Sequence, residues 1–336
     1  MKRSTTTLDD LVALLNDGQF HSGNALGEAL SISRTAVWKH LNFLQTQGID
    51  LHVDKHRGYR LAHPPFVLLN VDRILQHISS VTMKADQIAL FTQLPSTADY
   101  IKQLSSHDRS LPSICLAEQQ TQGRGRSGKL WHSPFGQNIY FSSVWRIDQD
   151  VSQLAGLSLA IGIALIRLLH RHQLNDVLLK WPNDLYWHDH KLSGVLIEVA
   201  AQANHQCHLF ISFGLNVNMP IAIDTLQTHR WTSMHHITGQ HYDRNVLIAH
   251  AIDQLADAIH QFSAQGLTAF STELKHYDYL YNKPICLSSS TTSSLQGIAK
   301  GIDEQGYLLL QTDPTQPIQR LNAGEVSVMQ IGDSSH

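Results

Sequence analysis

The chain has 336 residues, of which 42% are hydrophobic and 16% are charged, and its formal net charge is −3. This length and composition predict a soluble globular protein of two or three domains. The net charge excludes a uniformly basic protein, although it leaves room for a local basic patch.

The three cysteines stand far apart and form no CxxC pair, which predicts a reducing, cytoplasmic environment without a disulfide framework. The N-terminus begins Met1-Lys2-Arg3 and then turns polar, so no signal peptide is expected. The longest uncharged apolar run, residues 151–166, is too short to span a bilayer and is interrupted by glycines. It predicts a buried helix, and we expect no membrane association.

The first 45 residues predict a set of short helices. Apolar residues recur at helical spacing in 8–15, 23–30 and 33–45. Ser33 is a good N-cap for the last of these helices, and Val37, Leu41 and Leu44 form its core stripe. Two short helices joined by a tight turn, the second polar and cationic on its free face, indicate a helix-turn-helix.

Residues 48–61 complete this motif with a wing, because 48–53 alternate like a strand, 55–58 form a turn and 59–61 return. From Arg34 to Arg60 there are five Lys or Arg residues against two Asp. We therefore expect residues 1–62 to bind DNA. The expected contacts are Ser22, Ser33, Arg34, Thr35, Trp38, Lys39, Lys55 and Arg57. The alternative is a three-helix interaction domain with a solvated charged face.

A linker is predicted at the paired prolines 64 and 65, which stop both helix and sheet. Residues 67–270 then mix helices with strands. Strands are predicted at 112–120, 138–146, 177–181, 192–200 and 208–216, and helices at 154–172 and 245–266. The hairpin-like spacing of the last three strands predicts an α+β domain whose central mixed sheet is mainly antiparallel and carries packed helices.

The C-terminal segment, residues 275–336, is predicted to be a small all-β domain. Short strands are expected at 284–287, 295–302, 307–311 and 325–330. Turns rich in Ser, Thr, Asp and Pro separate them, which is typical of a small SH3-like β-barrel.

The segment that says most about function is the loop of residues 123–129, where three glycines and three cationic residues fall within seven positions. Glycines let backbone N–H groups approach a ligand, and cations attract a polyanion, so the loop predicts a site for phosphate or another acidic group. It satisfies the P-loop pattern up to Lys129, but Leu130 stands where Ser or Thr must hold magnesium, and no helix start follows. A flexible surface loop with scattered charges is the other alternative.

A transition-metal site is not favoured by the 22 histidines, which are scattered and match no HExxH or zinc-finger spacing. The tightest cluster, residues 188–190, falls in a predicted turn.

Four further segments combine polar side chains with turns and glycines. They are 95–97, 118–120, 180–184 and 191–194, and 214–218 ends a later strand in the same way. Each alone is commonly an ordinary turn with satisfied polar residues.

Together, and in this order, these segments resemble the biotin–protein ligases. The resemblance is carried by Glu118, Gln120, Gly123-Arg124-Gly125-Arg126, Gly128, Trp131, Ser133-Pro134, Gly136, Asn138, Lys180-Trp181-Pro182-Asn183-Asp184, Lys191-Leu192, Gly194, Gly214, Asn216 and Asn218. It extends over all three segments of the chain. The N-terminal winged helix makes the chain similar to the bifunctional form, in which biotin ligase and biotin-operon repressor share one chain.

The resemblance implies a class II synthetase-like ligase domain and a two-step reaction. Biotin carboxylate attacks the α-phosphate of ATP to give biotinyl-5′-AMP and pyrophosphate. A lysine of the biotin carboxyl carrier protein of acetyl-CoA carboxylase then attacks the mixed anhydride. Positioning and charge neutralisation would supply the catalysis, and the loop of residues 123–129 would fold over the adenylate and exclude water.

The resemblance also implies roles for individual residues. Biotin would be bound by Ser96, Thr97, Gln120, Arg124, Gly125, Arg126, Lys191 and Gly194. ATP or the adenylate would be bound by Gly123, Arg124, Arg126, Lys129, Trp131, Asn183 and Asn216. Lys191, Arg126 and Asp184 would be catalytic, with Asp184 also a candidate ligand for Mg²⁺.

Three positions depart from the family pattern. Ala98 stands where Asn is common, Lys129 replaces an Arg and loses its bidentate fork, and Ser212 stands where Gly is frequent. The family further implies that biotinyl-5′-AMP acts as corepressor and that the chain then forms a homodimer on a two-fold operator. The alternative function is a ligand-sensing transcriptional regulator that lacks ligase activity.

Overall fold

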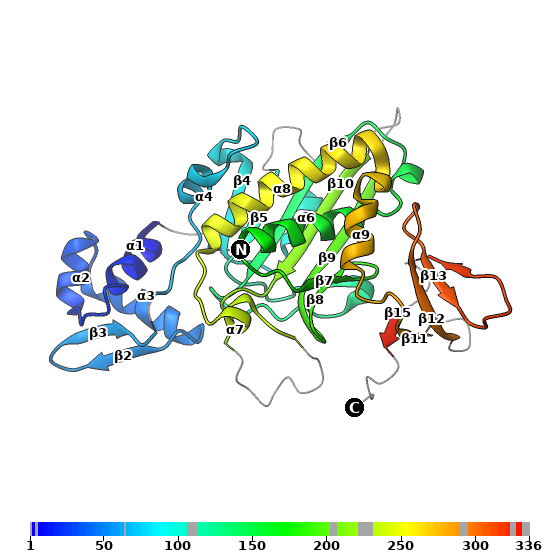
Figure 1. The fold of residues 1–336 in the computed structure, drawn as a ribbon. Coiled ribbons are helices and arrows are strands. Elements are labelled where there is room, and N and C mark those ends of the chain that lie inside the picture. The colour runs from blue at the N-terminus through cyan, green and yellow to red at the C-terminus, as the bar shows by residue number, and fades with distance from the viewer. Residues whose placement is uncertain are drawn as a thin grey trace.

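The computed structural model describes residues 2–3, 6–63, 65–105, 113–201, 207–220, 231–288, 295–322 and 327–330. Pro64 of the expected linker, Pro112 of an expected strand, and residues 289–294, 323–326 and 331–336 of the expected C-terminal domain lie outside this set. Figure 1 shows three bodies in chain order: helices and a hairpin, then a large sheet with helices, then a small sheet.

The N-terminal body is a helix-turn-helix with a two-stranded wing. Its elements are α1 (Thr6–Leu15), α2 (Gly23–Ala29), α3 (Arg34–Thr46), β2 (Leu51–Asp54) and β3 (Gly58–Leu61). Val37, Leu41 and Leu44 of α3 are buried against α1 and α2, so the predicted core stripe is confirmed. Its core continues into Phe66 and Phe135, which joins this body to the central one.

The central body is built on a mixed sheet. The strand order is β1-β4-β5-β6-β10-β9-β8-β7, and β4 and β5 are parallel whereas the other pairs are antiparallel. The strands are β1 (Lys2–Arg3), β4 (Ile88–Gln93), β5 (Ile114–Ala117), β6 (Ile139–Ile147), β7 (Val177–Lys180), β8 (Asp184–Trp187), β9 (His190–Ala201) and β10 (Cys207–Leu215). The edge strand β1 lies at the N-terminus and precedes the winged helix in the sequence, but it pairs with β4 of the central sheet.

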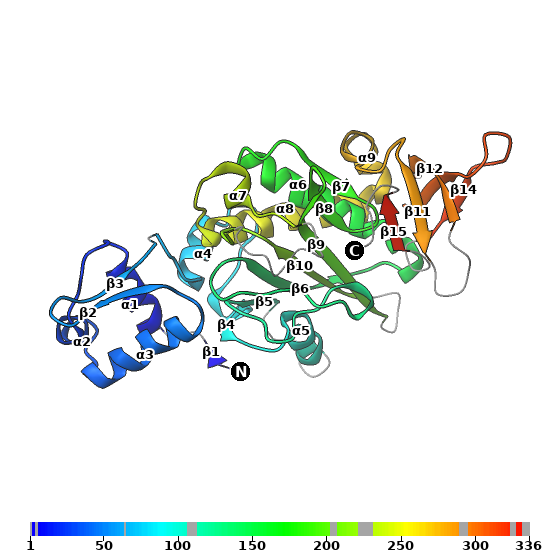
Figure 2. The ribbon, with the colours of Figure 1, turned by 90° about the horizontal axis from the view of Figure 1, so that it is seen from below.

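Helices cover both faces of this sheet. Figure 2 shows α6 (Leu157–Arg171) and α8 (Arg244–Gln265) on one side and α5 (Thr97–Ser105) on the other. Alternation along β5 explains the two layers, because Ile114 and Leu116 join the core beneath α6 and α8, whereas Cys115 and Ala117 face α5. The remaining helices of this body are α4 (Val71–His77), α7 (Met234–Thr238) and α9 (Ser271–Tyr277), and the 3-10 turns are Ala85–Gln87, Arg126–Gly128, Val151–Leu154 and Gly266–Phe270.

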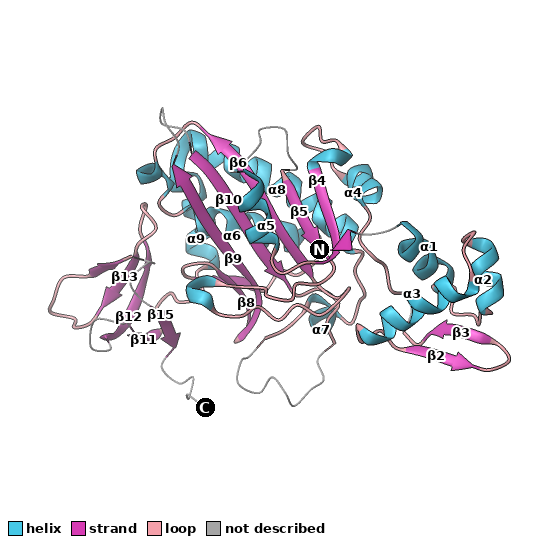
Figure 3. Cartoon of the chain, turned by 180° about the vertical axis from the view of Figure 1, so that it is seen from behind, coloured by secondary structure: helices cyan, strands magenta, loops and turns pink. Residues whose placement is uncertain are grey.

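The C-terminal body is a five-stranded antiparallel sheet, seen from behind in Figure 3. Its order is β14-β13-β12-β11-β15, with β11 (Pro284–Ser288), β12 (Leu295–Ile302), β13 (Leu308–Gln311), β14 (Gln319–Leu321) and β15 (Ser327–Gln330). Its β12–β13 turn reaches the central body, because the indole nitrogen of buried Trp181 donates to the Gly306 carbonyl at 3.0 Å. A small all-β domain is therefore confirmed at this end of the chain.

Candidate active site and DNA-binding face

Buried hydroxyl and amide groups meet where β4 and β5 end and α5 begins. Ser96 and Thr97 are 2% and 3% exposed, and the Gln120 side-chain oxygen accepts from the Thr97 backbone N–H at 2.9 Å and from its hydroxyl at 3.1 Å. The Ser142 hydroxyl lies 2.8 Å from the Thr97 hydroxyl and 2.9 Å from that of Ser212. The result is a small polar patch inside an apolar sheet, where a neutral polar ligand finds both donors and acceptors.

The glycine loop folds as a closed turn and not as a P-loop. The Gly125 N–H donates to the Lys129 carbonyl at 2.7 Å, and the Trp131 N–H donates to the Gly123 carbonyl at 2.8 Å. Between them, Arg126–Gly128 form one 3-10 turn, and the chain then passes through Leu130 without entering a helix. Gly123 leaves no room for a side chain, since a Cβ there would lie 2.8 Å from the backbone oxygen of Trp131.

A lysine–aspartate pair stands on β8 and β9. Lys191 Nζ donates to Asp184 Oδ2 at 2.7 Å, and both side chains are between one fifth and one third exposed. Gly194 lies opposite Asp184 in the sheet, and a Cβ at this position would come within 3.2 Å of the ammonium group. The glycine thus leaves room for a charge pair that a ligand can reach.

A second cation lies beside this pair. Arg126 Nη1 donates to the side-chain oxygen of Asn183 at 3.2 Å, and Asn183 is held in turn by the Val195 carbonyl at 2.6 Å. Burial lowers the pKa of Arg126, and the charge of Asp184 opposes that shift. The guanidinium still remains protonated at neutral pH, so a half-buried positive charge faces the site.

Trp131 lies across the end of β10. Its ring would strike a Cβ at Gly214, which would approach Trp131 Cε2 to 2.4 Å, and Lys191 Nζ lies 5.5 Å from the ring centroid. Among the residues that the structure describes, the buried indole N–H has no hydrogen-bond partner. An aromatic surface therefore lies directly next to the lysine–aspartate pair.

Two predicted site residues are engaged elsewhere by the protein itself. Asn216 is 5% exposed, and its amide donates to the Thr232 carbonyl at 2.9 Å. Arg124 is paired with Asp99 and Glu198. Lys129 is exposed on the loop.

No group of three or more His, Cys, Asp or Glu side chains is close enough to hold a metal ion anywhere in the described part of the chain. Among the same residues, no helix is sufficiently long and apolar to cross a membrane.

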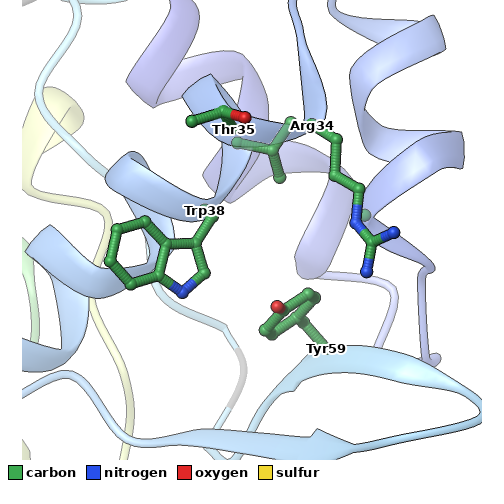
Figure 4. A pocket seen from close by; sticks show the side chains of 6 residues that line it. Arg34, Thr35, Trp38 and Tyr59 are labelled. Carbon is green, nitrogen blue, oxygen red and sulfur yellow. The ribbon is translucent and has the colours of Figure 1, made fainter.

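The DNA-binding residues predicted in α3 do share one exposed face. Arg34, Thr35, Trp38 and Lys39 are exposed, and Trp38 is 54% exposed despite its size. Figure 4 shows Trp38 and Arg34 on either side of Tyr59 from the wing. They border an open cavity of about 260 Å³ lined by Gly23, Arg34, Thr35, Val37, Trp38 and Tyr59.

The other predicted DNA contacts have mixed positions. The Ser22 and Ser33 hydroxyls cap α2 and α3 by accepting backbone N–H groups at 3.1 and 3.2 Å, which fixes the helix starts. Lys55 and Arg57 are exposed on the wing, and Arg57 lies 3.3 Å from Asp54 and above the Phe20 ring.

Comparisons with known proteins match all three bodies. The model of the "Biotin/lipoate A/B protein ligase family" matches residues 90–218, an "HTH domain" model matches 7–60, and the "Biotin protein ligase C terminal domain" matches 282–329. The "Bifunctional ligase/repressor BirA" of Escherichia coli K12 is 36% identical over 98% of both chains. The chain belongs to the BirA family of bifunctional ligase/repressors.

A more distant member of the BirA family and a solved ligase agree with this assignment. The Bacillus subtilis "Bifunctional ligase/repressor BirA" is 25% identical and covers 96% of this chain and 99% of its own. The structure of the "Biotin protein ligase from Aquifex aeolicus in complex with biotin and ATP" is 25% identical with a TM-score of 0.61, and it covers 72% of this chain and 98% of its own. The family predicted from the sequence is confirmed, and so is the fold class.

Sequence reasoning missed the hydroxyl chain of this BirA-family site. Ser142 and Ser212 are directly opposed in the β6–β10 register and 0% and 8% exposed. The available signal was the serines within the apolar runs of two strands, Ser142 and Ser143 in β6 and Ser212 in β10, because a polar side chain at such a position must find a buried partner.

Proposed function

We propose that the chain is an ATP-dependent biotin–protein ligase that also represses the biotin operon. In the first step an oxygen of the biotin carboxylate bonds to the α-phosphorus of ATP, and the bond to pyrophosphate breaks. In the second step the amine of a carrier-protein lysine attacks the acyl carbon, AMP leaves with the electron pair, and the amine loses a proton. The carrier is the biotin carboxyl carrier protein of acetyl-CoA carboxylase.

The ligase proposal rests on two cationic side chains that contact neighbouring residues in the sequence. Lys191 meets Asp184, and Arg126 meets Asn183, so both positive charges border the place where carboxylate and phosphate must approach each other. Such fixed charges stabilise the negative charge that develops in phosphoryl-type transfer and need no reorganisation during the step. Lys191 and Arg126 would act on the reacting groups, and Asp184 would hold Lys191 until substrate displaces it.

The remaining ligand contacts are those that the family resemblance implies, and the grouping of these residues around the glycine loop supports them. We assign biotin to the polar patch and the glycine loop, namely Ser96, Thr97, Gln120, Arg124, Gly125, Arg126, Lys191 and Gly194. We assign the nucleotide to Gly123, Arg124, Arg126, Lys129, Trp131, Asn183 and Asn216, where Trp131 offers a ring for adenine. Asn216 would act through the backbone it holds, because its amide is already bonded to Thr232.

Mg²⁺ would enter with ATP. Magnesium is commonly held by one or two carboxylates together with substrate phosphates, and Asp184 supplies one carboxylate next to the proposed phosphate position. The ion would neutralise phosphate charge.

We further propose domain limits of 1–62, 67–270 and 275–336 for the DNA-binding, ligase and C-terminal domains. Bound biotinyl-5′-AMP would favour a homodimer that places two winged helices on an operator with two half-sites, which sedimentation with and without the adenylate would detect.

Pyrophosphate release from biotin and ATP tests the ligase proposal, followed by labelling of a carrier domain. We expect release that depends on biotin, and transfer to a single carrier lysine. A chain that binds biotin and operator DNA but releases no pyrophosphate would instead be a ligand-sensing regulator without ligase activity.

DNA binding should depend on two kinds of contact that salt separates. Replacing Arg34 and Lys39 with Ala should weaken binding and lower the slope of log K against log [salt] by about 1.8, because each lost phosphate contact lowers it by about 0.9. Trp38→Ala should weaken binding at an unchanged slope, since the indole carries no charge. Titrations of an operator selected from random duplexes, at several salt concentrations, measure both.

The control is carrier biotinylation, which should remain at the parent rate in both the double variant and Trp38→Ala, because α3 carries none of the proposed ligase residues. If the double variant binds DNA with the parent's affinity and slope, α3 is not the reading helix, and the chain is better described as a ligase with an N-terminal interaction domain.

A further inference from the structure

An apolar cavity opens on the exposed face of the winged helix, beside the charged side chains proposed above to contact phosphates. Trp38 of α3 and Tyr59 of β3 line it together with the buried Val37 (Figure 4). Trp38 keeps 54% of its surface exposed, although an indole ring gains much free energy from burial. A single exposed apolar side chain is ordinary, but one that borders a cavity with a second aromatic ring indicates a contact surface for a partner.

The fold fixes the walls of this cavity through backbone hydrogen bonds. The Tyr59 N–H donates to the His21 carbonyl at 2.8 Å, and the His21 N–H donates to the Tyr59 carbonyl at 2.9 Å, so β3 is tied to the segment that starts α2. Gly58 permits this approach, because its φ is +102° and a Cβ there would lie 2.0 Å from the His21 carbonyl oxygen. The opposite wall begins at Ser33, whose hydroxyl caps α3. A ligand that enters therefore has little to reorder.

Gly23, the first residue of α2, keeps part of the cavity open. A Cβ at this position would lie 3.5 Å from Arg34 Cγ and 3.8 Å from Tyr59 Cε2, which are ordinary contact distances. The position therefore has room for a methyl group without displacement of its neighbours. Alanine at residue 23 would occupy space in the cavity and leave the helix in place, since alanine is the better helix former.

The charge of this face favours a nucleic acid as the partner. Four cationic side chains of α3 and the wing are exposed, namely Arg34, Lys39, Lys55 and Arg57. The second helix of a helix-turn-helix lies in the major groove, where the base edges present hydrogen-bonding groups and thymine presents its 5-methyl group. That methyl group is the apolar feature through which the major groove reports sequence, so it is the part of a duplex that fits an apolar cavity.

We infer that the cavity between Trp38 and Tyr59 receives the 5-methyl group of a thymine in each operator half-site, which makes these two side chains specificity-determining residues. This inference rests on the proposed DNA-binding function. Arg34 lines the same cavity, so the charged contact and the methyl contact lie side by side. Loss of one buried methyl group weakens an interaction by about fourfold, and this is the effect expected for each thymine that the cavity holds.

Replacing thymine with deoxyuridine tests the methyl contact, because it removes the methyl group and keeps every hydrogen-bonding group of the base pair. The full-length chain is titrated with an operator selected from random duplexes, in which the thymines are replaced one position at a time. Synthetic biotinyl-5′-AMP is present throughout, so the result does not depend on ligase activity. At one position of a half-site, the parent should bind the deoxyuridine operator about fourfold more weakly than the thymine operator.

Two variants assign that position to the cavity. Trp38→Ala removes a wall and should bind the thymine and deoxyuridine operators equally. Gly23→Ala fills part of the cavity and should also lower the ratio between the two operators. The matched control is Lys39→Ala, which removes an exposed cation from the same helix; it should bind both operators more weakly and keep the parent's ratio. If Trp38→Ala and Gly23→Ala both keep that ratio, the methyl group lies elsewhere and the assignment is wrong.

Cross-linking locates the contact directly. 5-Bromouracil carries a bromine close to the size of the methyl group, and on irradiation it bonds to an aromatic side chain that it touches. At the sensitive position, mass spectrometry should find the operator joined to Trp38 or Tyr59, and a cross-link outside the cavity would overturn the inference. A chain that selects no operator rejects the proposed repressor function and this inference with it. A chain that selects an operator but binds it equally with thymine or deoxyuridine at every position rejects the inference alone.

Discussion

Lys191→Ala should slow formation of biotinyl-5′-AMP by about 100-fold or more. One preorganised donor at a developing charge contributes about 3 kcal/mol to the transition state, and Lys191 is the ammonium that borders Asp184 in this site. The variant also leaves Asp184 without its counter-charge, so a carboxylate would then oppose the incoming phosphates. Single-turnover release of pyrophosphate, with biotin and ATP varied separately, measures the effect on the chemical step and on substrate binding.

The matched control is Lys39→Ala, which removes a lysine from the DNA-binding helix and should leave pyrophosphate release unchanged. Asp184→Asn separates the two roles of the pair, because it keeps the ammonium and removes the anion beside it. A Lys191→Ala protein that unfolds at the parent's denaturant midpoint and still turns over within threefold of the parent would show that this ammonium does not act on the reaction.

The spacing of apolar residues predicted most of the long strands and helices of the ligase domain. The strands β6 and β10 were placed to within a residue or two, since their runs of alternating and continuous apolar residues are bounded by turn residues. The helix expected over 154–172 is split, because Gly156 has φ +80° and separates a 3-10 turn from α6. Periodicity reports which face is buried and does not report this kind of interruption.

Local sequence patterns do not predict which side chains, far apart in the sequence, contact each other. The spacing of cations in the glycine loop predicted an anion site, but nothing local distinguishes Arg124, which meets Asp99 and Glu198, from Arg126, which meets Asn183. Both arginines stand next to glycines in the same seven residues. Their different partners are set by the sheet, which brings α5, β8 and β9 around one loop.

Glu118 is a second example of a long-range partner. It precedes the glycine loop and was included among the functional segments, yet its side chain is 1% exposed and lies 2.7 Å from Arg244, 126 residues away. Arg244 also donates to the Asn138 and Val67 carbonyls at 3.1 and 2.8 Å, and the other Glu118 oxygen accepts the Leu69 N–H at 2.5 Å. This pair joins β5, α8 and the segment that leaves the winged helix.

Arg244→Met should therefore destabilise the chain by about 3–5 kcal/mol. It leaves the Glu118 carboxylate buried without a counter-charge, and it leaves the Asn138 and Val67 carbonyls without their donor.

Arg320→Met is the matched control. Its ion pair with Asp303 is similarly short at 2.6 Å, but the arginine side chain is 51% exposed, so the expected loss is about 1 kcal/mol or less. Urea unfolding measures both variants, followed through exchange of the β5 and α8 amides for Arg244→Met and of the β12 and β13 amides for Arg320→Met. Glu118→Met combined with Arg244→Met should recover part of the loss, since a pair of apolar side chains leaves no buried charge unpaired. Equal midpoints for Arg244→Met and Arg320→Met would mean that water reaches Glu118, and that the three segments are held together by apolar packing alone.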